Sequence, residues 1–339
     1  MRASRLEFRR QTLNSQILHP AHNFEMVEAN VEVRWDPLTG YAARLVRANS
    51  ALLAPPSFDL QEFARTTQAT CPFCSERLDK ATPKLPPQIW PEGRIRRGQA
   101  VLFPNLLTYT KYSAVAVYSP ELHYIPLNEM TPDLVGDNLA THVEYIRGAM
   151  RADHDATWAS INANHMLPSG SSLFHPHVQS SVDPAPTTVQ QMLADVSGER
   201  FNAYLETEKS LGERYIGTTG DIEWLASFAP MGFNEVRAFI PGAVSPSELR
   251  EERVAELGRG VAKILNLYSE LGFQSFNMAL YGAPPGRRGY MLNLRLVCRS
   301  NLQSPYRSDV TYFERLHWQA MVDTVPEELA ATARQLFSS

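Results

Sequence analysis

The sequence predicts an α+β fold made of two similar halves, each an antiparallel sheet with a packed helix. Both halves show the same order of elements, strand–strand–helix–strand–loop–strand. In each half a Thr-Pro or Ser-Pro pair precedes a helical run whose apolar residues fall on one face. Each helical run is followed by two apolar, strand-like segments that a glycine-containing loop separates.

The composition is that of an ordinary globular protein. The 339 residues are 44% hydrophobic and carry a net charge of −4. A chain of this length suggests two domains, which we place at residues 1–190 and 191–339. The lack of a strongly basic field argues against nucleic acid as a partner. No apolar run has transmembrane length and no apolar segment follows the basic N-terminus, so we expect a cytoplasmic protein without a membrane partner.

The first half begins with polar residues and is then punctuated by turn and helix signals. The first thirty residues are expected to form an irregular arm or edge segment. In the turn at residues 36–40, Asp-Pro-Leu-Thr-Gly, proline and glycine are placed to reverse the chain. Strands are predicted at 99–103 and 108–118. A helix then begins at Thr131, because an N-cap residue, a proline and an acid follow one another there.

The stretch Ser172 to Gln179, Ser-Leu-Phe-His-Pro-His-Val-Gln, is the most informative one for function. In an extended strand His175, His177 and Gln179 share one face, so three polar groups can be aimed at one substrate. An imidazole held in a fixed orientation can act as a nucleophile toward phosphorus. The stretch therefore predicts a reactive histidine.

Residues just before this strand suit a phosphate group. Gly170, Ser171 and Ser172 offer backbone N–H groups and hydroxyls. Asn164 is a polar residue in a predicted strand that otherwise packs. A lone histidine is more often structural, but these neighbours favour a chemical role for His177.

The cysteines indicate a metal site rather than disulfides. Cys71, Cys74 and Cys298 are an odd number with one close pair, which indicates a reducing compartment. The CxxC pair lies in a polar, proline-rich region, so zinc is favoured over a redox pair or two buried thiols. Zinc needs two more ligands, and His123 and His175 are the best placed. This predicts a structural Cys2His2 zinc site that braces the histidine strand.

The second half repeats the order of the first. Two strands are expected within 224–240, and a helix is expected from Ser245 to Gly272. Strands at 273–280 and 290–299 complete the half. The apolar face of the helix consists of Val254, Leu257, Val261, Ile264, Leu265 and Tyr268.

The last strand of the second half lacks the histidines. In the register of the duplication, Asn293 stands where His175 stands in the first half, and Arg295 stands where His177 stands. We therefore expect one half to carry the chemistry and the other to give support or substrate contacts.

Taken in order, these motifs resemble the galactose-1-phosphate uridylyltransferase family, the transferase branch of the histidine-triad superfamily. Residues 36–40, 71–74, 119–123 and 172–179 carry the resemblance, which extends weakly toward Glu314. It implies two histidine-triad-like halves, with the catalytic histidine and the zinc site in the first. It also implies a homodimer, with a nucleotide sugar and a sugar phosphate as partners.

The resemblance assigns roles to individual residues. It implies that His177 attacks the α-phosphorus of a nucleotide sugar, while His175 ligates zinc with Cys71, Cys74 and His123. It implies that Gln179 donates to the phosphoryl oxygens, and because an amide cannot take a proton this favours transfer over hydrolysis. The other implied contacts are Asn164 and Ser172 to phosphate, Asn105 to the nucleoside and Glu314 to the sugar.

Three functions remain open at this point. The first is a nucleotidyltransferase resembling a UDP-glucose:hexose-1-phosphate uridylyltransferase, which works by ping-pong through a nucleotidyl-His177 intermediate. The second is a phosphorylase that uses inorganic phosphate as the acceptor and splits an ADP-sugar, a GDP-sugar or a dinucleotide. The third is a zinc-braced, non-catalytic nucleotide-binding protein.

Overall fold

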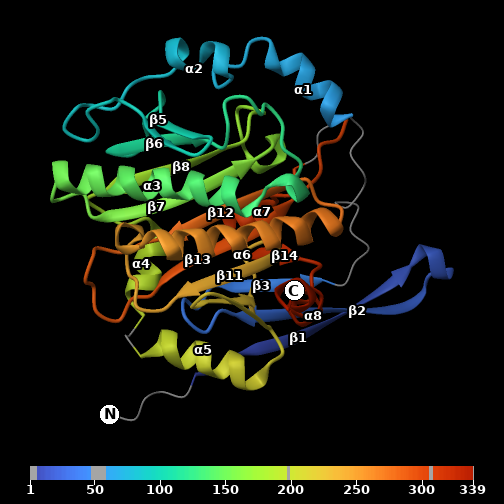
Figure 1. Ribbon diagram of the computed structural model, residues 1–339. Coiled ribbons are helices and arrows are strands. Elements are labelled where there is room, and N and C mark those ends of the chain that lie inside the picture. Colours follow the sequence, from blue (N-terminus) through green and yellow to red (C-terminus); the bar gives the residue numbers. More distant parts are fainter. Residues whose placement is uncertain (1–5, 47–58, 197–198, 305–307, 339) are drawn as a thin grey trace.

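A ten-stranded antiparallel sheet forms the centre of the molecule (Figure 1). The computed structural model describes residues 6–46, 59–196, 199–304 and 308–338. The large sheet has the strand order β4-β5-β6-β8-β7-β12-β13-β11-β10-β9. A smaller sheet has the order β1-β2-β3-β14, in which β14 pairs parallel with β3.

The bounds of the elements are as follows. The strands are β1 (Arg10–His19), β2 (Glu25–Trp35), β3 (Ala42–Val46), β4 (Ile95–Arg97), β5 (Ala100–Pro104), β6 (Tyr112–Val117), β7 (Trp158–His165), β8 (His177–Asp183), β9 (Tyr215–Thr219), β10 (Ile222–Ala226), β11 (Phe233–Ile240), β12 (Ser275–Tyr281), β13 (Leu292–Arg299) and β14 (Ala320–Val322). The α-helices are α1 (Leu60–Gln68), α2 (Ser75–Ala81), α3 (Pro132–Ala152), α4 (Thr188–Ala194), α5 (Arg200–Leu211), α6 (Glu251–Glu270), α7 (Tyr312–Leu316) and α8 (Pro326–Phe337).

The strand order has an internal symmetry, and it confirms the predicted fold of two equivalent halves. The order β4-β5-β6-β8-β7 in the first half recurs as β9-β10-β11-β13-β12 in the second. Helix α3 precedes β7 and α6 precedes β12, so each helix has the same place in its half. Antiparallel pairing of β7 with β12 joins the halves into one sheet. The domain boundary at residue 190 stays a prediction.

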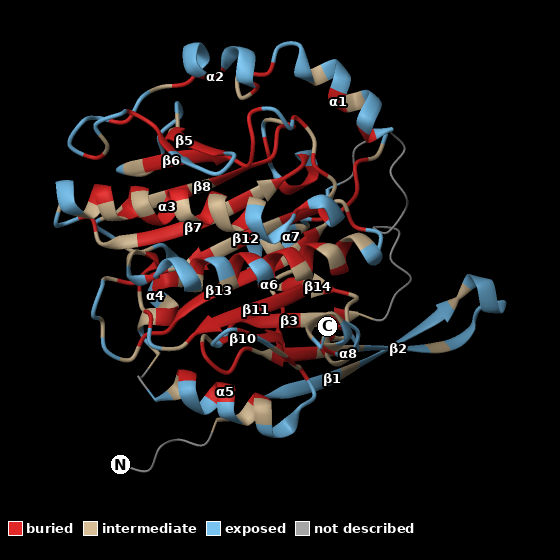
Figure 2. Cartoon of the chain, viewed as in Figure 1, coloured by how far each residue is buried: buried red, intermediate tan, exposed pale blue. Residues whose placement is uncertain are grey.

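Helices α3 and α6 cover one face of the large sheet and bury the main core against it (Figure 2). Helix α3 begins as predicted, with Thr131 Oγ1 accepting the Leu134 N–H at 3.3 Å and proline in the first turn. The two helices approach closely, because a Cβ on Gly258 would lie 2.8 Å from the Gly136 Cα. No helix in the described part of the chain has the length and apolar character needed to cross a membrane.

The second long helix starts later than the sequence predicts. Ser245 caps only a short 3-10 turn at Pro246–Glu248, and α6 begins at Glu251. The residue after this turn, Leu249, is extended and buried, and its carbonyl accepts a hydrogen bond from Arg147 at 2.6 Å. Burial of this leucine and the contact with α3 therefore interrupt the helical path that the Ser-Pro signal begins.

The N-terminal arm is regular, whereas the sequence predicts an irregular segment. Strands β1 and β2 form an antiparallel hairpin that projects from the body (Figure 1). Part of one face of the ribbon is apolar, since Leu13 pairs with Val31 and Ile17 with Val27. Ile17 is nonetheless 46% exposed. The periodicity of two in this polar stretch is the signal that distinguishes a ribbon from an irregular arm.

The turn at residues 36–40 is tied to the second half by buried charges. Asp36 Oδ2 accepts from Arg237 at 2.9 Å and from Arg295 at 3.2 Å, and Arg295 also bonds Glu235 at 2.6 Å. Burial would raise the pKa of Asp36, but Arg237, Arg295 and the backbone N–H groups of the turn lower it below its usual value. Arg295, which the predicted register places at the position of His177, is thus part of a buried ion network.

Two buried histidines make the stability of the fold dependent on pH. Burial lowers the pKa of both His142 and His165 to about 3. Unfolding exposes them, and the unfolded chain then takes up protons below about pH 6.5. Their contribution is therefore fully present above pH 6.5 and is lost as the pH falls toward 3, with a slope of up to about 1.4 kcal/mol per pH unit for each histidine.

We expect His142→Gln to make the free energy of unfolding less dependent on pH between 6.5 and 4.5. Urea titrations across this range measure the slope. His154→Gln is the control, because His154 is exposed and should leave the slope unchanged. A slope that is the same in wild type and His142→Gln would contradict the assignment.

Candidate active site and metal centre

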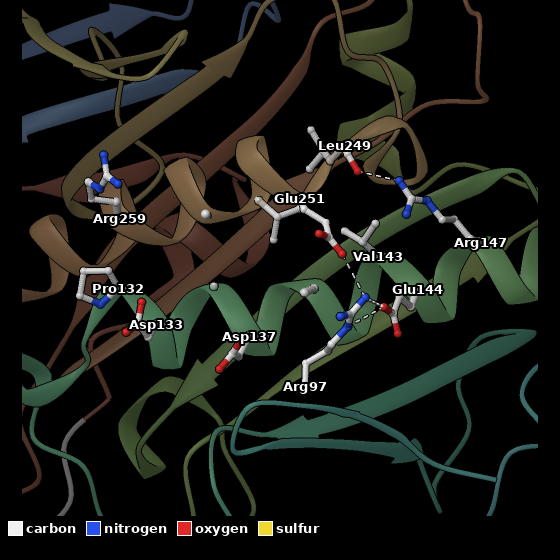
Figure 3. A pocket seen from close by; sticks show the side chains of 14 residues that line it. Arg97, Pro132, Asp133, Asp137, Val143, Glu144, Arg147, Leu249, Glu251 and Arg259 are labelled. Carbon is white, nitrogen blue, oxygen red and sulfur yellow. Dashed lines mark hydrogen bonds and ion pairs between the residues drawn. The ribbon is translucent and has the colours of Figure 1, made fainter. Parts of the chain in front are cut away.

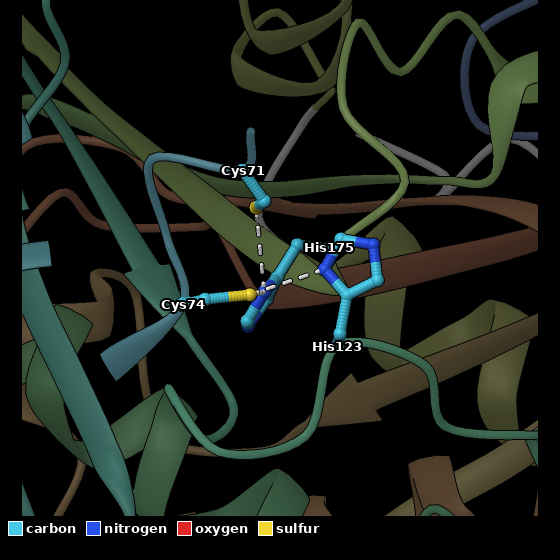
Figure 4. Close-up of side chains that lie close together, drawn as sticks. All are labelled: Cys71, Cys74, His123 and His175. Carbon is cyan, nitrogen blue, oxygen red and sulfur yellow. Dashed lines mark hydrogen bonds between the residues drawn. The ribbon is translucent and has the colours of Figure 1, made fainter. Parts of the chain in front are cut away.

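Four predicted metal ligands come together at the start of β8 (Figure 4). The ligand atoms of Cys71, Cys74, His123 and His175 all lie within 4.8 Å of one another, and all four residues are buried. Cys74 Sγ lies 3.3 Å from His123 Nδ1 and 3.6 Å from His175 Nδ1, and Cys71 Sγ lies 3.7 Å from His175 Nδ1.

These spacings fit a tetrahedral metal ion. An ion about 2.3 Å from sulfur and about 2.1 Å from nitrogen separates two such ligands by about 3.6 Å. Burial, followed by the neighbouring Cys71, raises the pKa of Cys74 to about 12. A divalent cation in the cluster would reverse this effect, because its charge stabilises the thiolate. The cluster can therefore hold a metal ion with all four positions supplied by the chain.

Neighbouring groups orient both imidazoles. His175 Nε2 lies 2.9 Å from the Ser119 carbonyl oxygen, to which its N–H donates, and His123 Nε2 lies 2.9 Å from Thr67 Oγ1 on α1. Both contacts leave Nδ1 facing the cluster, which is the arrangement that a metal ligand needs. The Phe73 N–H donates to Cys71 Sγ at 3.4 Å and further shapes the loop.

His177 is held in one tautomer beside this cluster. Its Nδ1–H donates to the His175 carbonyl oxygen at 2.8 Å, so the lone pair is on Nε2. The ring packs edge-on against Phe73 of the CxxC loop, with centroids 5.4 Å apart. Burial lowers the pKa of His177, which keeps Nε2 unprotonated. A buried imidazole with an unprotonated Nε2 is suited to nucleophilic attack.

Gln179 lies on the same side of β8 as His177. Its Nε2 is 3.4 Å from His177 Nε2, and its Oε1 accepts a hydrogen bond from the Tyr109 hydroxyl. The sequence predicted Gln179 but not Tyr109, because the run 108–118 looks like a strand. In the structure β6 begins at Tyr112, which leaves Tyr109 in the loop that follows β5. Burial raises the pKa of Tyr109, and the neighbouring Asn105 at the start of this loop opposes that effect.

Asn164 meets a residue of the second half across the β7–β12 seam. Asn277 Nδ2 donates to Asn164 Oδ1 at 2.6 Å and to the Ser169 carbonyl oxygen at 3.0 Å. Arg299 donates in turn to Asn277 Oδ1 at 2.6 Å, and a carboxylate, Asp309, binds the same guanidinium. The sequence analysis did not predict Asn277. The only signal for it was that a polar residue stands among the apolar residues of a predicted strand.

The loop before β8 contains the other predicted phosphate contacts. Gly170 has φ +94° with open space where a Cβ would lie. Ser171 is buried and its hydroxyl donates to the Leu173 carbonyl oxygen at 2.6 Å, whereas Ser172 is exposed. Ser172 lines a cavity together with His123. Ser172 is thus available to a ligand, while the Ser171 hydroxyl bonds within the loop; their phosphate roles stay predictions.

Glu314 has a local partner for each carboxylate oxygen. Oε2 accepts from the backbone and the hydroxyl of Thr311, both at 2.7 Å, and Oε1 accepts from the Met321 N–H at 2.9 Å. These bonds cap α7 and connect it to β14. No contact that the structure gives for Glu314 joins it to His177 or Gln179. Its role as a sugar contact stays a prediction.

A separate hollow lies between α3 and α6, on the opposite face of the sheet from His177 (Figure 3). Its charged groups are mostly paired with protein atoms. Arg97 bonds Glu144 and, at 3.2 Å, Glu251, while Arg147 donates to backbone carbonyl oxygens. Pairing of these cations leaves little charge for a ligand, so this hollow is not part of the candidate active site.

One known protein is similar to this chain over nearly its whole length. No family model matches the chain. A protein from Archaeoglobus fulgidus, described as an uncharacterized protein, is 33% identical over 344 residues, which is 98% of this chain and 99% of that protein.

Solved structures share the fold at low identity. An ADP-glucose phosphorylase from Arabidopsis thaliana with bound ADP-glucose has a TM-score of 0.69 and 17% identity, covering 90% of this chain and 99% of that chain. A GalT-like protein from the same plant has a TM-score of 0.65 and 17% identity, covering 89% and 98%. A uridylyltransferase has a TM-score of 0.59 and 19% identity, covering 90% and 98%.

The chain therefore shares the fold of the GalT-like protein, the uridylyltransferase and the ADP-glucose phosphorylase, the fold that the motifs predicted. The chain belongs to one family with the Archaeoglobus fulgidus protein.

We expect the purified protein to contain one metal ion per chain, measured by elemental analysis. Cys74→Ser should lose the ion and lower the melting temperature. A ligand at a hundred times its Kd contributes about 2.7 kcal/mol, which corresponds to about 4 °C for a chain of this size. The matched control is Cys298→Ala, which removes a buried thiol outside the cluster and should keep the ion. Metal retained in Cys74→Ser would contradict the assignment.

Proposed function

We propose that the protein is a nucleotidyltransferase that moves the nucleotidyl group of a nucleoside diphosphate sugar to a sugar 1-phosphate through an adduct on His177. The observation that carries the proposal is the His177 tautomer, with Nδ1–H bound to a carbonyl oxygen and Nε2 beside the Gln179 amide. The fold shared with a uridylyltransferase and an ADP-glucose phosphorylase supports it.

The first transfer step can be written with the groups present. His177 Nε2 attacks the α-phosphorus, the N–P bond forms, and the bond from phosphorus to the bridging oxygen breaks. The electron pair leaves on the sugar 1-phosphate, a stable anion that needs no proton. The adduct ring is positively charged, and its Nδ1–H stays on the His175 carbonyl oxygen, which stabilises that charge. Gln179 donates to the non-bridging phosphoryl oxygens.

The second step reverses the first with a different anion. A phosphate oxygen of the acceptor attacks the same phosphorus, the N–P bond breaks, and the pair returns to Nε2. No group in this scheme acts as a general base, which agrees with an amide rather than a titratable side chain at Gln179. Water attack, in contrast, gains from a base. This difference supports transfer over hydrolysis.

We propose zinc as the metal, because two thiolates and two imidazoles at tetrahedral spacing are its usual structural ligands. When bound, the ion supplies rigidity rather than reactivity, since the chain would fill all four positions. Cys71 and Cys74 would hold the CxxC loop, and His175 would hold the start of β8. A reducing, cytoplasmic location is part of the proposal because the site needs thiolates.

An alternative acceptor is inorganic phosphate, which would make the protein a nucleotide-sugar phosphorylase. The likeness to the ADP-glucose phosphorylase favours it. We also propose a homodimer, which the exposed apolar face of the β1–β2 arm supports: a two-stranded ribbon is marginal in water without cover.

The wild-type protein should gain the mass of one nucleoside monophosphate on His177 when it is incubated with a UDP-, ADP- or GDP-sugar. Mass spectrometry of the intact chain and of its peptides measures the gain. His177→Ala should form no adduct and lose at least about 1,000-fold in turnover, or about 4 kcal/mol. His154→Ala, an exposed histidine, is the control.

The labelled protein from this experiment also serves to identify the acceptor. Sugar 1-phosphates and inorganic phosphate are added separately to the isolated adduct. Loss of the nucleotidyl group from His177 is measured for each. Nucleotide binding without any adduct would overturn the proposed transfer and favour the non-catalytic, nucleotide-binding alternative.

Gln179→His should increase loss of the adduct to water relative to transfer, because an imidazole can accept a proton from the attacking water. The ratio of hydrolysed to transferred nucleotide measures this effect. Gln179→Ala is the comparison: it should slow adduct formation without raising the share lost to water. An equal ratio in wild type and Gln179→His would count against the role assigned to the amide.

A further inference from the structure

We propose that Tyr109 is a positioning residue for the reaction described above, and that its hydroxyl fixes the Gln179 amide with the NH2 group toward the phosphoryl group on His177. This inference rests on the proposed function. It concerns a residue that the sequence motifs do not single out. Tyr109 would act through Gln179 and need not touch the substrate.

The contact itself is direct. The Tyr109 hydroxyl donates to Gln179 Oε1, and Gln179 Nε2 lies 3.4 Å from His177 Nε2. An amide flip would exchange these ends and aim the Oε1 lone pairs at the negatively charged phosphoryl oxygens. Only one of the two orientations therefore stabilises the transfer.

Two neighbours set that orientation. His177 Nδ1–H donates to the His175 carbonyl oxygen, so His177 Nε2 carries a lone pair and is matched by a donor, the Gln179 NH2 group. The other end of the amide, Oε1, then meets the Tyr109 hydroxyl, which donates to it. Once Nε2 carries the phosphoryl group it can no longer accept a hydrogen bond, and the Tyr109 hydroxyl is the contact that keeps Oε1 turned away from the phosphoryl oxygens.

The residues opposite Gln179 on the two neighbouring strands do not orient its amide. Gln179 lies opposite Val115 on β6 and Asn162 on β7. Valine offers no polar group, and Asn162 Nδ2 donates to Ser160 on its own strand at 2.9 Å. Among the hydrogen bonds given for the described residues, those of the Gln179 side chain go to Tyr109 and His177.

Because Tyr109 is exposed, a positioning role can be distinguished from a structural one by experiment. Tyr109 is 68% exposed and lies in the loop between β5 and β6. Removal of one exposed hydroxyl should leave the melting temperature unchanged, since surface substitutions seldom affect stability much. A loss of rate without a loss of stability therefore reports on positioning.

The test measures the rate of nucleotidyl-His177 formation in Tyr109→Phe, Gln179→Ala and the double variant, with the nucleotide sugar that labels the wild type. We expect Tyr109→Phe to slow adduct formation about tenfold with little change in KM. In the Gln179→Ala background the same change should have no further effect, because the group that it orients is gone. Tyr112→Phe is the matched control, since it removes a tyrosine hydroxyl that is not among the described hydrogen-bond partners of Gln179, Tyr109 and His177.

A second measurement needs no turnover. The side-chain NH2 resonances of Gln179, identified by their loss in Gln179→Ala, should shift in nucleotide-free Tyr109→Phe and stay in place in Tyr112→Phe. No shift would overturn the inference. If the wild type is labelled and Tyr109→Phe forms the adduct at the same rate, the inference is overturned and the proposed function stands. The same holds if Tyr109→Phe slows adduct formation equally in the wild-type and Gln179→Ala backgrounds. An unlabelled wild type would overturn the proposed function itself.

Discussion

His175 is the residue on which the candidate site depends, because three of its groups contact different neighbours. Its Nδ1 faces the two thiols, its Nε2–H bonds the Ser119 carbonyl oxygen, and its own carbonyl accepts from His177. The candidate metal cluster and the proposed nucleophile, His177, thus meet at one residue. Any movement of the cluster changes the direction in which His177 Nε2 points, although the metal would take no part in the chemistry.

The two halves have the same fold and different contents. In the first half, the face of the sheet away from the long helices carries His177 and Gln179. In the second half the corresponding face is filled by Arg237 and Arg295 with their carboxylate partners. Buried ion pairs are costly to break and seldom improve stability. The second half nevertheless reaches the candidate site at the seam, where Asn277 orients Asn164.

The sequence predicted features that are local or that repeat a pattern, and it missed contacts made by folding. The CxxC spacing located two members of the Cys2His2 cluster, and the Thr-Pro signal located α3. The start of α6 was wrong, because burial of Leu249 depends on contact with α3. Asn277 was missed since its partner lies across a strand pairing that no spacing encodes. Tyr109 was missed because aromatic residues at a strand end look like strand.

The N-terminal turn has a consequence for the order of events during synthesis. Asp36 binds Arg295, 259 residues later, and β3 pairs with β14. On the ribosome Asp36 and β3 must wait for synthesis of β13 and β14 before they find these partners, whereas β5 to β8 can pair within their own half. The turn at residues 36–40 therefore lacks its buried ion partners while most of the two halves is being made. Completion of the fold is tied to the arrival of β13 and β14.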